Sequence, residues 1–290
     1  MRSILFVPGL IAATFAVAVC GSEAQHESLN DLLGRAGAAE TRAEYPDARK
    51  LYELATSEFP TEAAAWAALG EHLRFYVHDD KAAVAAFQRA LSAQHPDPHA
   101  AAFAWRGLGE IELHAGHGDA ALDAFKRSLA AEPLADTHRS LCHYYVRERN
   151  FKLAAEHAGK AVELNPHDAI ARLLYAAELF RAGEPDRARQ QFEAALESSG
   201  LNSNGEAKGH VHCCILYNAA GYLCVAGQKE RSLTVLQHFF DTPNHLHLTR
   251  EQVENDPDFE SIKATPEFRQ LLERAYAGAP KTKALQTIPE

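Results

Sequence analysis

Side chains that could bind a metal gather in the C-terminal third of the 290-residue sequence. They are His210, His212, Cys213, Cys214, His245 and His247. Imidazole and thiolate groups at short spacing are ligands for Zn²⁺ or Cu ions. The spacing matches no structural zinc pattern, however, and the 16 histidines are spread over the whole chain, so local runs arise easily. We therefore predict no metal site. A metal-binding or enzymatic protein that uses this cluster, near residues 210–247, is the alternative.

Other catalytic patterns are missing from the sequence. It contains no G-x-S-x-G, H-E-x-x-H or C-x-x-C motif and no phosphate-binding glycine loop. Adjacent carboxylates such as Asp79 and Asp80 are typical of a solvated turn. We predict that the protein is not an enzyme and needs no cofactor. The net charge of −10 argues against a nucleic-acid partner, because that function usually needs a basic surface.

The first residues resemble an export signal. Arg2 precedes an apolar run over residues 4–19, which is too short for a comfortable membrane span. Ala16-Val17-Ala18 fits signal-peptidase cleavage, whereas residues 17–20 resemble a lipobox that ends at Cys20. We therefore assign residues 1–24 to a signal peptide or a lipoprotein signal, and an uncleaved anchor is a third alternative. Each predicts an exported protein, with periplasmic or envelope-attached bacterial placement favoured over secretion.

The remaining cysteines are Cys142, Cys213, Cys214 and Cys224. If residues 213–226 form one helix, its cysteines at the two ends lie roughly 15 Å apart, which is beyond disulfide reach. We favour thiols over disulfides for these residues.

A pattern of large and small residues recurs along the chain. One copy has Trp105, Leu108, Gly109, Gly116, Ala121, Phe125 and Pro133. An upstream copy has Trp66, Leu69, Gly70, Ala83, Phe87 and Ala90, with one extra residue in its turn. Downstream copies include Leu141, Tyr145, Phe151, Ala154 and Pro166, and then Tyr175, Leu179, Gly183, Ala188 and Phe192. This pattern resembles the tetratricopeptide repeat.

The resemblance predicts an all-α, right-handed α-solenoid of stacked helix-turn-helix repeats. Small residues allow the two helices of a pair to approach closely, and large ones fill the space to the next pair. We expect about five helical pairs over residues 25–202, a linker over 203–210 and a sixth, divergent pair over 211–242. Residues 243–290 should form capping helices and a tail, because Thr249 and Thr265 are suitable N-caps.

The resemblance also implies a function. In this family the first helix of each pair lines a concave face, so we expect a non-catalytic scaffold that binds a protein or peptide in that groove. The predicted groove residues are Glu71, Arg74, Phe75, Arg106, Glu110, His114, Arg139, His143, Arg147, Glu178, Arg181 and Tyr217.

Two of these groove residues suggest the chemistry of a partner. Arg106 and Arg139 occupy equivalent positions in successive repeats and could form a basic ladder for an acidic peptide. Relatives that bind chaperone tails use a Lys/Asn clamp, but Glu110 and His143 stand where its Asn residues would be. The clamp's specific activity is therefore not expected here. An architectural spacer without a groove ligand is the remaining alternative.

Overall fold

The computed structural model describes residues 27–200, 213–242 and 248–277. The predicted export signal, Cys20 and the predicted linker lie outside these residues. The described residues form six helical pairs followed by a short C-terminal unit. The first helices of the pairs are α1 (Leu29–Thr41), α3 (Ala63–His72), α5 (Pro98–His114), α7 (Ala135–Arg147), α9 (Ala169–Arg181) and α11 (Cys213–Val225). The second helices are α2 (Tyr45–Glu58), α4 (Asp80–Leu91), α6 (Gly118–Ala131), α8 (Phe151–Leu164), α10 (Pro185–Ser199) and α12 (Lys229–Asp241).

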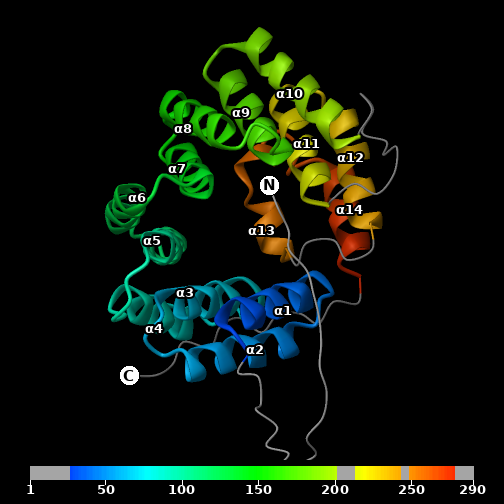
Figure 1. Ribbon diagram of the computed structural model, residues 1–290. Coiled ribbons are helices and arrows are strands. Elements are labelled where there is room, and N and C mark those ends of the chain that lie inside the picture. Colours follow the sequence, from blue (N-terminus) through cyan, green and yellow to red (C-terminus); the bar gives the residue numbers. More distant parts are fainter. Residues whose placement is uncertain (1–26, 201–212, 243–247, 278–290) are drawn as a thin grey trace, which may run out of the picture.

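The pairs stack in chain order into a curved solenoid. Each first helix packs most extensively on the second helix of its own pair, and contacts between pairs join mainly sequence neighbours. Figure 1 shows the helices following an arc from α1 to α12. The predicted all-α solenoid is confirmed. None of the described helices is both long and apolar enough to cross a lipid bilayer.

Turn chemistry explains where the helices begin and end. Gly116 and Gly183 have φ angles of +85° and +86°, a left-handed conformation that glycine adopts without a Cβ clash. Pro133 and Pro166 follow the ends of α6 and α8 by two residues, because proline cannot continue a helix. The local sequence therefore sets the lengths of the helices and, through them, the stacking of the pairs.

One aromatic side chain locks the second pair to the third. Phe87 on α4 is fully buried between Gly70 on α3 and Gly107 on α5. A Cβ atom at Gly70 would lie 2.5 Å from a ring carbon of Phe87, and one at Gly107 would be closer still. The two glycines therefore provide the space into which this ring inserts. Phe125 on α6 packs against Gly109 in the same way.

The extra residue of the second pair takes the form of a π-helix. Residues Leu73–Val77, labelled η1, continue α3 with a wider turn, which ends at His78 in the left-handed conformation with φ +56°. Asp79 then caps α4 by accepting from the backbone N–H of Ala82. A π-turn inserts one residue without breaking the helix, and it rotates the side chains that follow the insertion.

The C-terminal unit covers the last pair. It contains α13 (Arg250–Glu254), the 3-10 turn η2 (Pro257–Phe259) and α14 (Pro266–Ala275). Thr249 and Thr265 are the N-caps of the two α-helices, as predicted. Phe259, Ile262 and Phe268 are fully buried in the core shared with α11 and α12. This burial is consistent with the expected capping role of the unit.

The packing of Phe87 between Gly70 and Gly107 gives a stability prediction. Gly107→Ala should lower the free energy of unfolding by about 1–3 kcal/mol, because Phe87 must move to accept the new methyl group. Gly34→Ala is the matched control, since a Cβ atom there meets nothing within 4 Å on the exposed side of α1. That variant should be unchanged or up to about 1 kcal/mol more stable. Thermal and urea unfolding measure the stability of both variants. Equal stability of the two would contradict the proposed role of Gly107 in making room for Phe87.

Candidate functional site

A cavity of about 420 Å³ opens between α1, α3 and α5. Its floor consists of alanines on α3 and α5, and rings from several helices surround it. The residues that line it are Leu33, Glu40, Tyr52, Ala64, Ala67, Ala68, Glu71, His72, Phe75, Tyr76, Asp97, His99, Ala100 and Phe103. The positions on α3 recur every three or four residues, so one face of this first helix forms the cavity wall. The cavity therefore lies on the face that was predicted to bind a partner.

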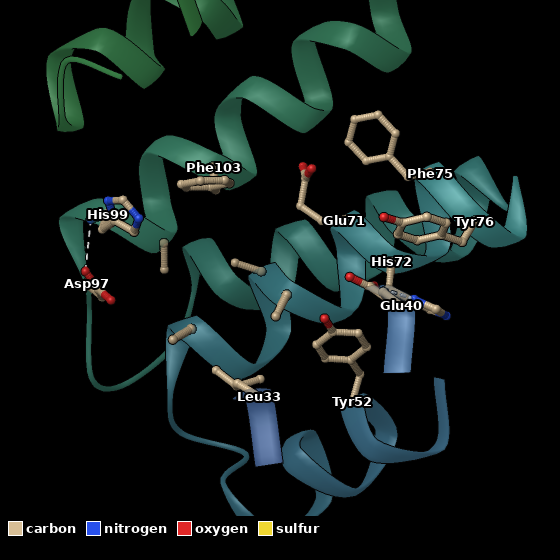
Figure 2. A pocket seen from close by; sticks show the side chains of 14 residues that line it. Leu33, Glu40, Tyr52, Glu71, His72, Phe75, Tyr76, Asp97, His99 and Phe103 are labelled. Atoms are coloured by element: carbon tan, nitrogen blue, oxygen red, sulfur yellow. Dashed lines mark hydrogen bonds and ion pairs between the residues drawn. The ribbon is translucent and has the colours of Figure 1, made fainter. Parts of the chain in front are cut away.

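The π-helix supplies two aromatic side chains at the mouth of this cavity. Phe75 is 50% exposed and Tyr76 is 40% exposed, although large apolar side chains in this fold are otherwise mostly buried. Tyr76 stacks on Tyr45 at the start of α2, with ring centroids 4.7 Å apart. Figure 2 shows the Glu71 carboxylate between the rings of Phe75 and Phe103. Aromatic side chains held in this way offer large contact area at low entropic cost.

A polar cluster lies at the base of the cavity. The Nδ1 atom of His72 lies 2.8 Å from a carboxylate oxygen of Glu40 on α1. His72 is 1% exposed, and its ring lies against those of Tyr52 and Tyr76. Burial raises the pKa of Tyr52, and the charge of Glu40 raises it further. The cluster ties α1 to α3 and fixes the shape of the cavity.

Four charged groups on η1, α3 and α5 form a buried network beside the cavity. Arg106 contacts Glu71 at 2.8 Å and Glu110 at 3.1 Å, and Arg74 contacts Glu110 at 2.6 Å. The hydroxyl of Ser140 on α7 donates to Glu110, which extends the network to a third repeat. Burial opposes the charge of Arg106, but Glu110 and Glu71 raise its pKa. Burial raises the pKa of Glu71, although Arg106 and Arg74 oppose this. Burial also opposes the charge of Glu110, but the same two arginines lower its pKa. The network therefore pairs two arginines with two carboxyl groups.

The predicted basic ladder is not formed. Arg106 is 5% exposed, and its charge is balanced by Glu71 and Glu110. Arg139 is paired with Asp136 at 2.6 Å and with Asp168 at 3.3 Å. The two arginines share a register, but each already has carboxylate partners within its own chain. They therefore offer no unpaired positive charge to an acidic peptide, and this part of the sequence-based expectation is corrected.

The remaining predicted residues near the middle of the groove differ in exposure. His114, His143 and Arg147 are exposed. Arg147 donates to the backbone carbonyl of Leu113 at 2.6 Å, so it joins α7 to α5.

The C-terminal part of the groove is occupied by the chain itself. Arg181 on α9 pairs with Asp258 at 2.5 Å and also with Glu178. The hydroxyl of Tyr217 on α11 donates to Asp256 at 2.7 Å. In Figure 1, α13 lies inside the arc, and the turn η2 that follows it contacts α11. Two of the predicted partner-binding residues, Arg181 and Tyr217, therefore hold the segment that follows α13, and a third, Glu178, pairs with Arg181.

Several residues of the cavity were not predicted from the sequence. Phe103, Tyr76 and His72 were missed because the repeat register marks equivalent positions, and these rings have no counterpart in the other copies. The signal that could have found Tyr76 is the extra residue in the second copy, since a single insertion at a helix end is typical of a π-turn. Phe103 has no such signal in the sequence.

The metal alternative falls largely outside the described residues. His210, His212, His245 and His247 lie there, whereas Cys213 and Cys214 begin α11. Within residues 27–200, 213–242 and 248–277, no group of three or more potential ligands is placed to hold a metal ion. The four cysteines in these ranges form no disulfide. Burial raises the pKa of Cys142 and Cys224, which keeps these thiols protonated.

The comparison with known proteins agrees with this architecture. Residues 77–136 and 141–203 match the tetratricopeptide repeat family. Over these residues the chain is similar to tetratricopeptide repeats. No curated protein matches the chain in sequence.

Solved structures with this fold cover most of the chain. The type IV pilus biogenesis factor PilW is 18% identical over 75% of this chain and 96% of its own, with a TM-score of 0.54. PilF of Pseudomonas aeruginosa is 14% identical over 85% of this chain and 97% of its own, with a TM-score of 0.52. A chain of the APC/C hetero-tetramer Cut9–Hcn1 is 13% identical over 87% of this chain and 43% of its own, with a TM-score of 0.56. At these identities the likeness establishes the all-α solenoid fold alone.

The buried network gives a second prediction. Arg106→Gln should lower the free energy of unfolding by about 3–5 kcal/mol, because Glu71 and Glu110 would remain buried with too little positive charge. Arg139→Gln is the control, since the Arg139 side chain is 30% exposed and its ion pairs are partly solvated. That change should cost about 1 kcal/mol or less. Urea unfolding compares the two; a small loss in both would show that Arg106 is not structural.

The C-terminal contacts give a pH prediction. Burial raises the pKa of Glu178 and of Asp256 to about 7, with Asp258 adding to both shifts. A carboxyl group whose pKa is higher in the folded state stabilises the fold below its unfolded pKa and loses this contribution as the pH rises through 7. Asp256→Asn cannot ionise, and its amide oxygen can keep one of the two hydrogen bonds that the carboxylate accepts, from the Tyr217 hydroxyl or from the Asp258 N–H. Relative to the wild type, it should gain about 2 kcal/mol between about pH 5 and about pH 8.

The free energy of unfolding of the wild type and of Asp256→Asn, measured across this pH range, tests the prediction. Asp186→Asn is the control, because its side chain is 88% exposed at the start of α10. Its stability should follow that of the wild type at each pH. Parallel profiles for the wild type and Asp256→Asn would contradict the predicted role of Asp256.

Proposed function

We propose that this protein is a non-catalytic scaffold that binds a segment of another protein in the N-terminal half of its concave groove. The observation that carries the proposal is the aromatic-lined cavity between α1, α3 and α5. Its volume is within the range of sites that bury most of a small ligand or several side chains. Phe75 and Tyr76 stand exposed at its mouth, which is costly in water unless a partner covers them.

The division of the groove supports the same proposal. The first helices of the fifth and sixth pairs hold the chain's own residues 256–259 through Arg181 and Tyr217. These contacts leave the cavity at α1, α3 and α5 uncovered by any described segment of the chain. An extended or helical partner segment is therefore expected there, with Phe75 and Phe103 as the apolar anchors.

We further propose that the scaffold acts outside the cytosol. This rests on residues 1–24, whose short positive start and apolar run resemble a signal peptide or a lipoprotein signal. Attachment to a membrane through a lipid on Cys20 or an uncleaved signal, or release into the periplasm, follows from how that segment is processed. The intact mass of the mature protein tests this proposal. We expect a mass that lacks the leader, with or without a diacylated Cys20, whereas an unprocessed, unmodified N-terminus would contradict cleavage.

Site-specific photo-crosslinking tests the cavity directly. Replacing Phe75 with p-benzoylphenylalanine should give a covalent adduct to a partner in the native cell, because this position is 50% exposed beside the cavity. Leu164 is the matched control, since it is 49% exposed but lies on α8, a second helix. The adduct at position 75 should be lost when Phe103→Ala removes the opposite ring. Equal adducts at both positions, or none at position 75, would count against the cavity as a binding site.

A further inference from the structure

The cavity lining contains acidic side chains but no lysine or arginine. Three of its side chains are carboxylates, namely Glu40, Glu71 and Asp97, and none of the residues that line it is a lysine or an arginine. Burial raises the pKa of Tyr76, and the charge of Glu40 raises it further. Arg74 and Arg106 lie behind the wall, where the buried network already uses their charges. A ligand in the cavity therefore meets carboxyl groups and no lysine or arginine, although Arg106 and Arg74 offset part of the charge of Glu71 from behind the wall.

The rings around Glu71 are arranged to accept a positive group. The guanidinium of Arg74 lies 3.7 Å from the centroid of the Phe75 ring, and that of Arg106 lies 5.0 Å from that of Phe103. Both rings therefore already serve as cation–π acceptors for the chain's own arginines. The same two rings also line the cavity. Aromatic faces beside a carboxylate are the surroundings in which ammonium and guanidinium groups bind well.

A buried acceptor on Glu71 lacks a partner. Its Oε2 atom binds Arg106, whereas Oε1 is buried and forms no hydrogen bond with any described residue. The Nε2 atom of His72, on the same face of α3, is also buried without a hydrogen bond to the described part of the chain. A buried polar atom without a partner costs free energy that a bound donor can recover. A lysine or arginine side chain supplies such donors, whereas a carboxylate supplies none.

We infer that the cavity binds a basic segment of a partner protein, and this inference rests on the proposed function. A lysine or arginine side chain of that segment lies at Glu71, between Phe75 and Phe103. Apolar residues next to that basic residue pack on the alanine floor formed by α3 and α5. An acidic segment is disfavoured because it would bring further negative charge against three carboxylates with no cation in the lining. The net charge of −10 also favours a cationic partner.

Selection of random short peptides displayed on phage, with the full chain as bait, tests this inference. We expect enriched peptides in which a lysine or arginine lies beside apolar residues. Their affinity should fall about tenfold when norleucine replaces that lysine, and again when Phe75→Ala removes one ring. Raising the salt concentration from about 0.05 M to about 0.5 M should weaken the same peptides, because their charge attraction is screened.

Two charge variants locate the basic residue. Glu71→Gln should lower the affinity for the enriched peptides about tenfold, because the basic side chain is expected at Glu71. Asp97→Asn should lower the affinity less, because Asp97 lies at the start of α5 and not between the two rings. Asn can still cap α5, so Asp97→Asn should keep the fold. This variant therefore still tests the inference if Glu71→Gln disturbs the buried network around Arg106. Glu53→Gln is the control, because Glu53 pairs with Arg49 on the exposed side of α2. This control should leave the affinity unchanged.

The outcomes separate the two proposals. Neutral or acidic peptides that depend on Phe75 but not on Glu71 or Asp97 would overturn the basic-segment inference and leave the groove function standing. Peptides whose binding does not change with Phe75→Ala, or the absence of any enriched peptide, would overturn both. Basic peptides that depend on Phe75 and on at least one of the two carboxylates support both.

Discussion

A helical hairpin of this length cannot bury its apolar face alone, and the rest of the structure depends on how each hairpin closes against the next. Phe87 shows the constraint most clearly, because its ring fills the space that two glycines on neighbouring first helices leave open. A solenoid built this way is stabilised by contacts between adjacent pairs rather than by one central core. The relative placement of α3 and α5 is therefore set by packing, and these helices form the cavity wall.

The charged network then determines what that wall can bind. Two arginines and two glutamates are removed from water between α3, η1 and α5, and their mutual attraction must offset a large desolvation cost. Such a network contributes less to net stability than its contacts suggest, but it leaves no spare positive charge. Glu71 is shared between the network and the cavity, because only one of its oxygens binds an arginine. The lining of the cavity consequently contains carboxyl groups and no lysine or arginine, although two arginines lie directly behind it.

The sequence predicts the repeat architecture better than it predicts the site. Repeat spacing identifies the buried phenylalanines and the left-handed glycines, since these recur at fixed positions and have one physical role each. Spacing also places Arg106 on the inner face, but it cannot show that Glu71, 35 positions earlier, lies within reach of its guanidinium. The contact between Arg181 and Asp258 spans 77 positions and links a repeat to a segment outside the repeats. No periodicity connects such residues, so only the three-dimensional arrangement shows which predicted groove side chains are already occupied.

The two ends of the groove have opposite chemistry, and this affects how a partner could bind. At α9 and α11, an arginine and a tyrosine hydroxyl hold the acidic residues Asp258 and Asp256 of the chain's own C-terminal segment. Phe259, in the same segment, is fully buried in the core, so displacing the segment would open the cap of the solenoid. An acidic ligand would have to compete for those contacts at this cost. A basic ligand at α1, α3 and α5 has no such competitor among the described residues, so the proposed partner can bind without disturbing the end of the fold.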